Sequence, residues 1–381
     1  MDYFGKERTH MKISKRLLPL LVILAVFIIG CSSVSKTDIE KAITNELDLL
    51  KNLDSETTLK YISYQELFPN STENADLSDE VKEVFSLFFQ DFTYKVLDID
   101  VDKSNQSATA SVRLCTLDSK ALAADYAASR LRNAILSDVD SKDTEENTDS
   151  LAERYLLLNH LLKTHKYDTA ERNCEIKLQK SSDKHGTWEI KRTSTLENDL
   201  VGGLITYLSD PDILSPEDTL AVYLKTLKKM NVEEMSNFLG VESLLNTTDS
   251  DKNAIASALV EQVHKKFNYE ITGSTSEGYS AVVEAKITSF DSESILTAYQ
   301  QELDTYLSST DAVIDGSEKR ANYSLQLLLK NIQENKSTHT STAVFHLVND
   351  GISWSLENGS EELGNAIFGT LATTPVDEEA Y

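Results

Sequence analysis

The sequence predicts an α+β protein made of two tandem copies of one domain, each a helix-packed, curved antiparallel sheet. The first observation is a repeat: Phe92-Thr-Tyr94 returns as Phe267-Asn-Tyr269, and an alternating strand pattern follows both. A repeat of this length indicates duplication of a whole domain. The second observation is that the predicted strands come in neighbouring pairs, which favours an antiparallel sheet packed on helices over a parallel sheet.

The length of the chain agrees with two domains. The chain has 381 residues, and a single core rarely keeps growing beyond about 250–300 residues. We expect the first domain to span residues 37–209, a linker 210–216 and the second domain 217–372, followed by an acidic tail over 373–381. In Ser215-Pro216, a capping Ser before a Pro at the first helical position predicts a helix start.

The first 30 residues have the pattern of an export signal peptide that is removed. Basic residues precede an apolar run from Leu17 to Ile29, which is shorter than the roughly 20 residues that a spanning helix needs. The run ends in Gly30-Cys31 and a polar segment follows. This pattern resembles the lipobox of bacterial lipoproteins. The resemblance implies cleavage between Gly30 and Cys31, lipidation of Cys31 with fatty acids such as palmitate, and a tether over residues 31–36.

Two alternatives stay open for this segment. It could be a membrane-spanning anchor, or a buried helix that ends in an incidental Cys, although a core helix would be amphipathic. Either Met1 or Met11 could be the true start. Under the lipobox interpretation, several acyl chains hold the protein stably on the outer face of the cell membrane. Cys31 would then serve in anchoring and have no role in chemistry.

The charge of the chain opposes nucleic-acid binding. The formal net charge is −25, and removal of residues 1–30, which hold five basic and two acidic residues, makes it −28. Such acidity keeps a tethered protein soluble and disfavours binding to nucleic acid or to an anionic lipid surface.

The helices of the first copy precede its sheet. Thr37-x-x-Glu40 has the pattern of a capping box at the start of a helix, and apolar residues from Ile39 to Leu50 fall on one side of that helix. A short helix is expected around residues 56–67. A third helix is expected after Ser78, with four apolar residues on one face: Val81, Val84, Phe85 and Phe88.

The strand pattern of the first copy contains a slip of phase. Apolar residues alternate from Phe92 to Val96, and the alternation then continues one residue out of step at Leu97, Ile99 and Val101. Such a slip exposes an apolar face unless the strand carries a β-bulge. The second strand places Ala108, Ala110, Val112 and Leu114 on one face. Two helices, strands near 168–180 and 186–192, and a helix over 200–208 complete the copy.

The order of elements and the aromatic positions resemble the nuclear transport factor 2-like (cystatin-like) fold, especially tandem, uncharacterised domains of Gram-positive lipoproteins. No diagnostic motif supports the resemblance. It implies a curved sheet that wraps helices into a cone. Any pocket in such a cone would be lined by aromatic residues at matching positions of the two copies, namely Tyr94, Tyr126, Trp188, Tyr269, Tyr299 and Trp354.

We predict no catalytic residue, cofactor or metal site. His160 and His165 bracket a helix end without a third ligand, whereas a metal needs about three or four; His264 and His346 are expected at the surface. Ketosteroid isomerase, which shares the cone fold, uses Tyr and Asp. The corresponding candidates would be Tyr94, Tyr269 and Asp98, but the Tyr residues follow the apolar phase, and Gly273 stands at the position aligned with Asp98.

Two smaller features lead to structural predictions. Cys115 and Cys174 fall on opposite faces of their strands, so we expect no disulfide between them. Gly202-Gly203 lies in the predicted helix over 200–208, where glycine lowers stability. We interpret this pair as the result of close packing of the helix on the sheet, in preference to a ligand contact.

The sequence therefore predicts a membrane-anchored extracytoplasmic lipoprotein that acts as a non-catalytic binding or scaffolding module at the cell envelope. Its partner would be an unidentified protein or small molecule, in addition to the membrane through the N-terminal lipid. The alternative is a small-molecule enzyme or ligand receptor that uses the cone pocket of one repeat. Transport-associated solute receptors usually alternate strands and helices in α/β lobes, which this chain does not do.

Overall fold

The computed structural model describes residues 36–52, 67–68, 79–140, 150–182, 186–239, 241, 250–359, 361–369 and 371. The signal segment with Gly30 and Cys31, most of the helix expected over 56–67 and the tail over 373–381 lie outside the described residues. The chain divides into two compact units. Unit 1 includes residues up to Ser119 and from Ser150 to Ile205, whereas unit 2 includes residues from Lys120 to Asp149 and from Thr206 onward.

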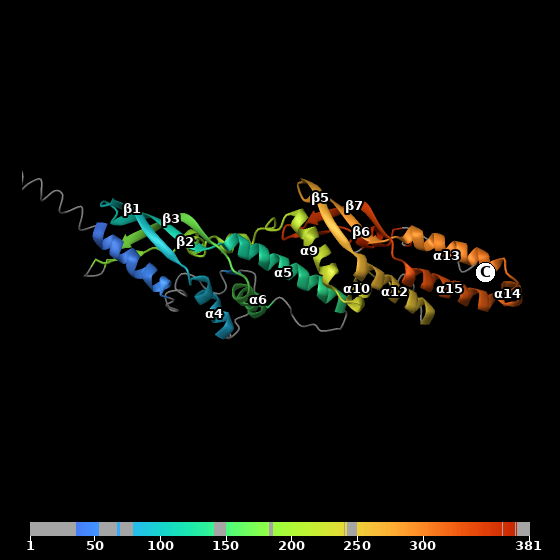
Figure 1. The fold of residues 1–381 in the computed structure, drawn as a ribbon. Coiled ribbons are helices and arrows are strands. Elements are labelled where there is room, and N and C mark those ends of the chain that lie inside the picture. Colours follow the sequence, from blue (N-terminus) through green and yellow to red (C-terminus); the bar gives the residue numbers. More distant parts are fainter. Residues whose placement is uncertain are drawn as a thin grey trace, which may run out of the picture. The chain divides into compact units, whose positions relative to one another are not determined.

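Each unit is an α+β fold around one four-stranded antiparallel sheet, which confirms the predicted fold class (Figure 1). In unit 1 the strands follow one another across the sheet in chain order. They are β1 (Thr93–Asp102), β2 (Ser107–Leu117), β3 (Thr169–Lys180) and β4 (Trp188–Ile190). Helix α4 (Asp79–Phe88) packs on α6 (Leu151–Thr164), and α7 (Ser194–Leu200) contacts β2 and β3.

The N-terminal helix covers residues 36–51, and its predicted apolar face, Ile39, Ile43, Leu47 and Leu50, is buried. The helix already includes Lys36, so the predicted cap at Thr37 lies inside the helix and not before it. An apolar stripe specifies which face of a helix is buried more reliably than it specifies the residue at which the helix begins.

A β-bulge lies in the first strand of each sheet. The register between β1 and β2 shifts between Val96 and Asp98, and the intervening Leu97 is exposed while Ile99 is buried. The bulge resolves the slip of phase and confirms that prediction. The register between β5 and β6 shifts in the same way between Ile271 and Gly273.

The second strand of unit 1 shows why the two cysteines stay apart. Its predicted inward residues Ala108, Ala110, Val112 and Leu114 are buried, as alternation along a strand requires. Cys174 is buried opposite Val112, whereas Cys115 pairs with Glu171. Both cysteines are free, as predicted.

Unit 2 repeats this sheet with more helix around it. Its sheet contains β5 (Asn268–Glu277), β6 (Ser280–Phe290), β7 (Thr338–Asn349) and β8 (Trp354–Leu356). The described helices that contact the sheet are α9 (Pro216–Lys229), α12 (Ser250–Lys266) and α16 (Glu361–Phe368). Ser215 Oγ accepts the backbone N–H of Asp218, and Pro216 opens α9, so the predicted helix start is confirmed.

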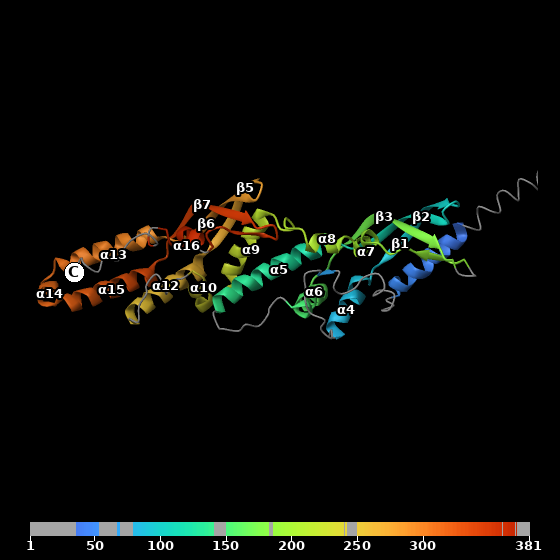
Figure 2. The same ribbon diagram turned by 180° about the vertical axis from the view of Figure 1, so that it is seen from behind.

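Other helices of unit 2 pack on helices. α10 (Val232–Phe238) packs on α12. α13 (Ser292–Leu307), the short α14 (Thr310–Ile314) and α15 (Ser317–Glu334) follow one another, and α13 lies beside α15 (Figure 2). Tyr299, Leu303 and Tyr306 of α13 and Leu327 of α15 form a small core of their own.

One long helix, α5 (Ser119–Asp140), lies in the first repeat of the sequence but packs in unit 2. The sequence repeat aligns α5 with α13, and the expected boundaries place it in the first copy. From Lys120 onward, however, it belongs to unit 2. Ile135 is buried in the core of that unit, and Leu131 and Leu136 pack against the same core. Unit 2 therefore includes a helix that its own repeat does not supply.

The glycine pair interrupts the helix that was predicted over 200–208. α7 ends at Leu200, α8 (Leu204–Leu208) begins after the pair, and both Gly202 and Gly203 have positive φ angles. A Cβ on Gly202 would lie 2.5 Å from the hydroxyl oxygens of Thr116 and Ser119. The continuous helix was wrong, because two left-handed residues end it. The close packing against the sheet is confirmed.

Candidate functional site

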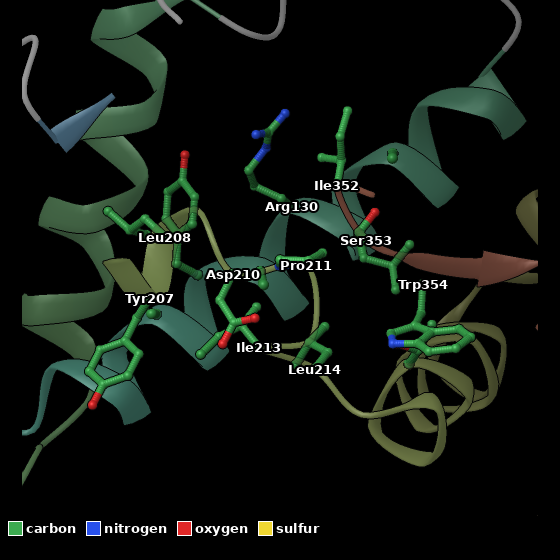
Figure 3. A pocket seen from close by; sticks show the side chains of 16 residues that line it. Arg130, Tyr207, Leu208, Asp210, Pro211, Ile213, Leu214, Ile352, Ser353 and Trp354 are labelled. Carbon is green, nitrogen blue, oxygen red and sulfur yellow. The ribbon is translucent and has the colours of Figure 1, made fainter. Parts of the chain in front are cut away.

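Unit 2 contains a cavity of about 250 Å³. Three stretches of chain and one residue of α9, Thr219, surround it. The stretches are one face of α5, the segment from Tyr207 to Leu214 that leads into α9, and the turn between β7 and β8 (Figure 3). All lining residues belong to unit 2. The cavity is thus a property of this unit alone.

The face of α5 that lines the cavity is rich in alanine. Six of its residues line the cavity, at spacings of three and four that place them on one side of a helix: Ala123, Tyr126, Ala127, Arg130, Leu131 and Ala134. The three alanines extend no farther than Cβ, so the helix can lie beside the other walls and still leave space. Arg130 is exposed, whereas Tyr126 is buried.

The second wall is held in place by hydrogen bonds that converge on Asp212. Asp212 Oδ1 accepts the indole Nε1–H of Trp354 at 2.8 Å and the amide Nδ2 of Asn349 at 3.1 Å. The same amide donates to the carbonyl oxygen of Pro211 at 3.2 Å. Asp210 Oδ1 accepts the backbone N–H of Asp212 at 3.0 Å. The segment that leads into α9 is therefore fixed to the ends of β7 and β8.

The third wall is a tight turn that carries Ile352, Ser353 and Trp354. Asp350 Oδ1 accepts the backbone N–H groups of Ile352 and Ser353 at 2.8 and 3.0 Å, and these bonds lower the pKa of Asp350 below its usual value. Trp354 is 5% exposed, while Ile352 is 79% exposed. The turn therefore contributes one buried aromatic ring and one apolar side chain that remains accessible to solvent.

One polar side chain in the cavity wall has an unmet hydrogen-bonding group. Thr219, in the first turns of α9, is 1% exposed, and its Oγ1 has no hydrogen-bond partner among the described residues. Buried hydroxyl groups are nearly always paired with protein or water. The Thr219 hydroxyl is therefore available to form a hydrogen bond with a molecule in the cavity.

Two of the six predicted aromatic residues come together in this cavity. Tyr126 and Trp354 both line it, although the sequence places them in different repeats. The cavity is not enclosed by the cone of one repeat, because α5 and the segment before α9 form two of its walls. The assignment of these residues as ligand contacts remains a prediction.

The other four aromatic residues lie elsewhere. Tyr94 donates its hydroxyl to Asp48 Oδ1 at 2.7 Å, Trp188 is half-buried in β4, and Tyr269 packs beside the ring of Phe267. Tyr299 Oη lies 2.6 Å from Ser324 Oγ. None of the four lines the cavity described above.

The Tyr and Asp pair considered as an enzymatic centre is not assembled. Asp98 is an exposed residue 3.8 Å from Lys36 Nζ, whereas the Tyr94 hydroxyl is bound to Asp48. Burial, together with the hydrogen bond to Asp48, raises the pKa of Tyr94 above its usual value. The hydroxyl therefore stays protonated near neutral pH and serves to join β1 to the N-terminal helix.

The histidines do not form a metal centre in the part of the chain that the structure describes. Within these residues, no group of three or more His, Cys, Asp or Glu side chains is placed to hold a metal ion. His346 is exposed, as expected, but its Nδ1 lies 2.8 Å from Glu362 Oε1. The sequence analysis missed this partner because Glu362 follows sixteen residues later, in α16.

Residues 212–367 match a family model described as Domain of unknown function (DUF5105). The DUF5105 region starts at Asp212, between the lining residues Pro211 and Ile213, and contains Thr219 and Trp354. It covers less than half of the chain and leaves out α5. No curated protein matches the chain.

A search of solved structures finds a putative lipoprotein (YcdA) from Bacillus subtilis subsp. subtilis strain 168. It is 13% identical and covers 72% of this chain and 96% of its own, with a TM-score of 0.27. A TM-score this low supports no argument about function. In the described part of the chain, none of the helices combines the length and the apolarity needed to cross a bilayer.

Sequence reasoning missed Thr219 and Asp212 as residues of the site. Thr219 is a polar residue among the apolar positions of α9, and Asp212 is an ordinary turn residue beside Pro211. The alanine stripe of α5 carried a usable signal. Alanines at helical spacing in a long, weakly amphipathic helix indicate a face that packs closely on something.

Proposed function

We propose that the chain is a lipid-anchored, extracytoplasmic binding protein whose second unit holds a small apolar ligand, or an apolar group of a partner, in the cavity beside α5. The observation that carries this proposal is the joint placement of Tyr126 and Trp354 in the walls of that cavity. Mainly apolar walls with a few placed polar groups are typical of binding sites.

The lining supports binding in preference to catalysis. The described residues around the cavity include neither His, Cys nor Lys, and the carboxylate of Asp210 already accepts the backbone N–H of Asp212. An activated nucleophile requires a base within hydrogen-bond reach. Thr219 Oγ1 has no hydrogen-bond partner among the described residues, and therefore no base beside it, so retention of a ligand fits this hydroxyl better than conversion.

The anchor is tested through Cys31. Cells that express the wild-type chain and the C31S variant would be labelled with an alkyne analogue of palmitate and fractionated. We expect label and membrane retention in the wild type and loss of both in C31S. Label on C31S, or equal membrane retention of unlabelled wild type, would contradict the anchor.

The binding site is tested by filling the cavity. The full mature chain would be titrated with indene, an apolar bicyclic probe, by saturation-transfer NMR. Ala127 lines the cavity, while Ala128, the next residue along α5, does not. We expect A127F to abolish binding and A128F to retain it, with both variants folded by circular dichroism. Equal binding by A127F and the wild type would rule out this cavity as the binding site.

A further inference from the structure

We infer that the cavity takes a compact, uncharged and largely apolar molecule with one hydrogen-bonding group, and that Thr219 Oγ1 receives that group. This inference rests on the proposed binding function and adds the chemical class of the ligand and the residue that selects it. The juxtaposition that carries it is a buried, unpartnered hydroxyl in an otherwise mainly apolar wall.

The backbone of Thr219 is satisfied while its side chain is not. The backbone N–H of Thr219 donates to the carbonyl oxygen of Ser215 at 2.9 Å, as part of the first turn of α9. The hydroxyl, which can both donate and accept, has no partner among the described residues. A buried unpaired hydroxyl destabilises the free protein. A ligand that forms a hydrogen bond with this hydroxyl removes that cost and therefore binds more tightly.

The two carboxylates near the cavity already accept hydrogen bonds. Asp212 Oδ1 accepts from Trp354 and Asn349, and Asp210 Oδ1 accepts from the backbone of Asp212. Arg130 and Asp210 carry opposite charges, and both are among the labelled lining residues (Figure 3). This balance of charge in the lining favours an uncharged ligand.

The volume sets the size of the ligand. An apolar cavity of about 150 Å³ accommodates benzene. The cavity of about 250 Å³ in unit 2 therefore matches two fused rings or a short branched chain. It falls just below the range of about 300–1,000 Å³ that is usual for larger ligands. Indole and indene fit this size, and only indole carries an N–H group that can pair with Thr219.

The test compares these two probes on the full mature chain by isothermal titration calorimetry. We expect the wild type to bind indole about fivefold more tightly than indene, as one net hydrogen bond provides. T219V keeps the shape of the side chain and removes the hydroxyl. It should abolish the preference for indole and raise the Tm of the free protein. T219S, which keeps the hydroxyl, should retain the preference.

A matched control comes from the same helix. Thr226 is 3% exposed in α9 but does not line the cavity, so T226V should leave the preference for indole unchanged. Equal affinity of the wild type for the two probes, or an undiminished preference for indole in T219V, would overturn the role of Thr219. Binding of indene by the wild type would still support the proposed function. If neither probe bound the wild type, both the role of Thr219 and the proposed function would be refuted.

Discussion

The indole Nε1–H of Trp354 donates a 2.8 Å hydrogen bond to Asp212 Oδ1, and this bond joins β8 to the segment that leads into α9. The same oxygen accepts the amide of Asn349, the last residue of β7. Trp354 and Asp212 stand far apart in the sequence, and their contact brings two walls of the cavity together. The cavity therefore depends on a polar contact as well as on its apolar lining.

Removal of either partner should loosen unit 2. W354F keeps most of the ring and loses the donor, and D212A removes the acceptor from Trp354 and Asn349. We expect D212A to lower the free energy of unfolding by about 1.5–3 kcal/mol, the value for hydrogen bonds to charged groups. Urea denaturation of both single variants and the double variant would measure their coupling, expected at about 0.5–3 kcal/mol. Strictly additive losses would show that the two side chains do not interact.

Gly202 should not tolerate a side chain. Its φ of +63° is unfavourable for other residues, and a Cβ would lie 2.5 Å from the Thr116 and Ser119 hydroxyl oxygens. We expect G202A to cost at least about 2 kcal/mol of unfolding free energy. Gly364, inside α16, has no neighbouring atom within 4 Å of such a Cβ, so G364A should stabilise by about 0.5–1 kcal/mol. A stable G202A protein would refute the packing at this turn.

The start of α13 should respond to acid. Asp291 accepts the Ser294 hydroxyl at 2.6 Å and the Ser294 backbone N–H at 3.0 Å, and these bonds hold the pKa of Asp291 below its usual value. Because its pKa is lower in the folded state, the ionised Asp291 carboxylate stabilises the folded protein at pH values above the unfolded pKa of about 3.9. This stabilisation is lost as the pH falls through the folded pKa.

D291A should therefore be less stable than the wild type by about 1 kcal/mol at neutral pH, and the difference should shrink below about pH 4. Urea denaturation across this range measures the difference. Thr193 caps α7 through an uncharged hydroxyl, so the loss of unfolding free energy in T193A should not depend on pH in this way. A D291A deficit that stays constant down to pH 2 would argue against the depressed pKa.

The two thiols should remain unpaired and differ in reactivity. Burial raises the pKa of the Cys174 thiol to about 12, so the reactive thiolate is scarce at neutral pH. Intact mass should not change with reductant. Brief alkylation of the native protein with iodoacetamide should leave Cys174 unmodified, and full alkylation should require denaturant. Rapid labelling of native Cys174 would mean that β3 opens readily.

Local patterns predicted the sheet well. The alternation of Ala108, Ala110, Val112 and Leu114 specifies a buried face because side chains alternate along any strand. The same rule separated Cys115 from Cys174. The slip of phase at Leu97 predicted a bulge, since an unbulged strand would have exposed one of its two apolar faces.

The cavity was not predictable in the same way. It depends on α5, whose helical spacing says that Ala123 and Ala127 share a face but not which unit that face packs on. Whether the Thr219 hydroxyl has a hydrogen-bond partner depends on which atoms surround it in the folded protein. Likewise, Trp354 was predicted as a residue that could line a pocket, whereas its bond to Asp212 joins residues that no local pattern connects.

The two bulges bear on the history of the chain. Leu97 and Thr272 occupy the same position of β1 and β5, and the register shifts around each in the same way. An irregularity shared at one position of both sheets is inherited most simply from a single ancestral domain that already carried it. The residue at the bulge has since diverged from an apolar to a polar side chain, while the kink in the backbone has persisted in both descendants.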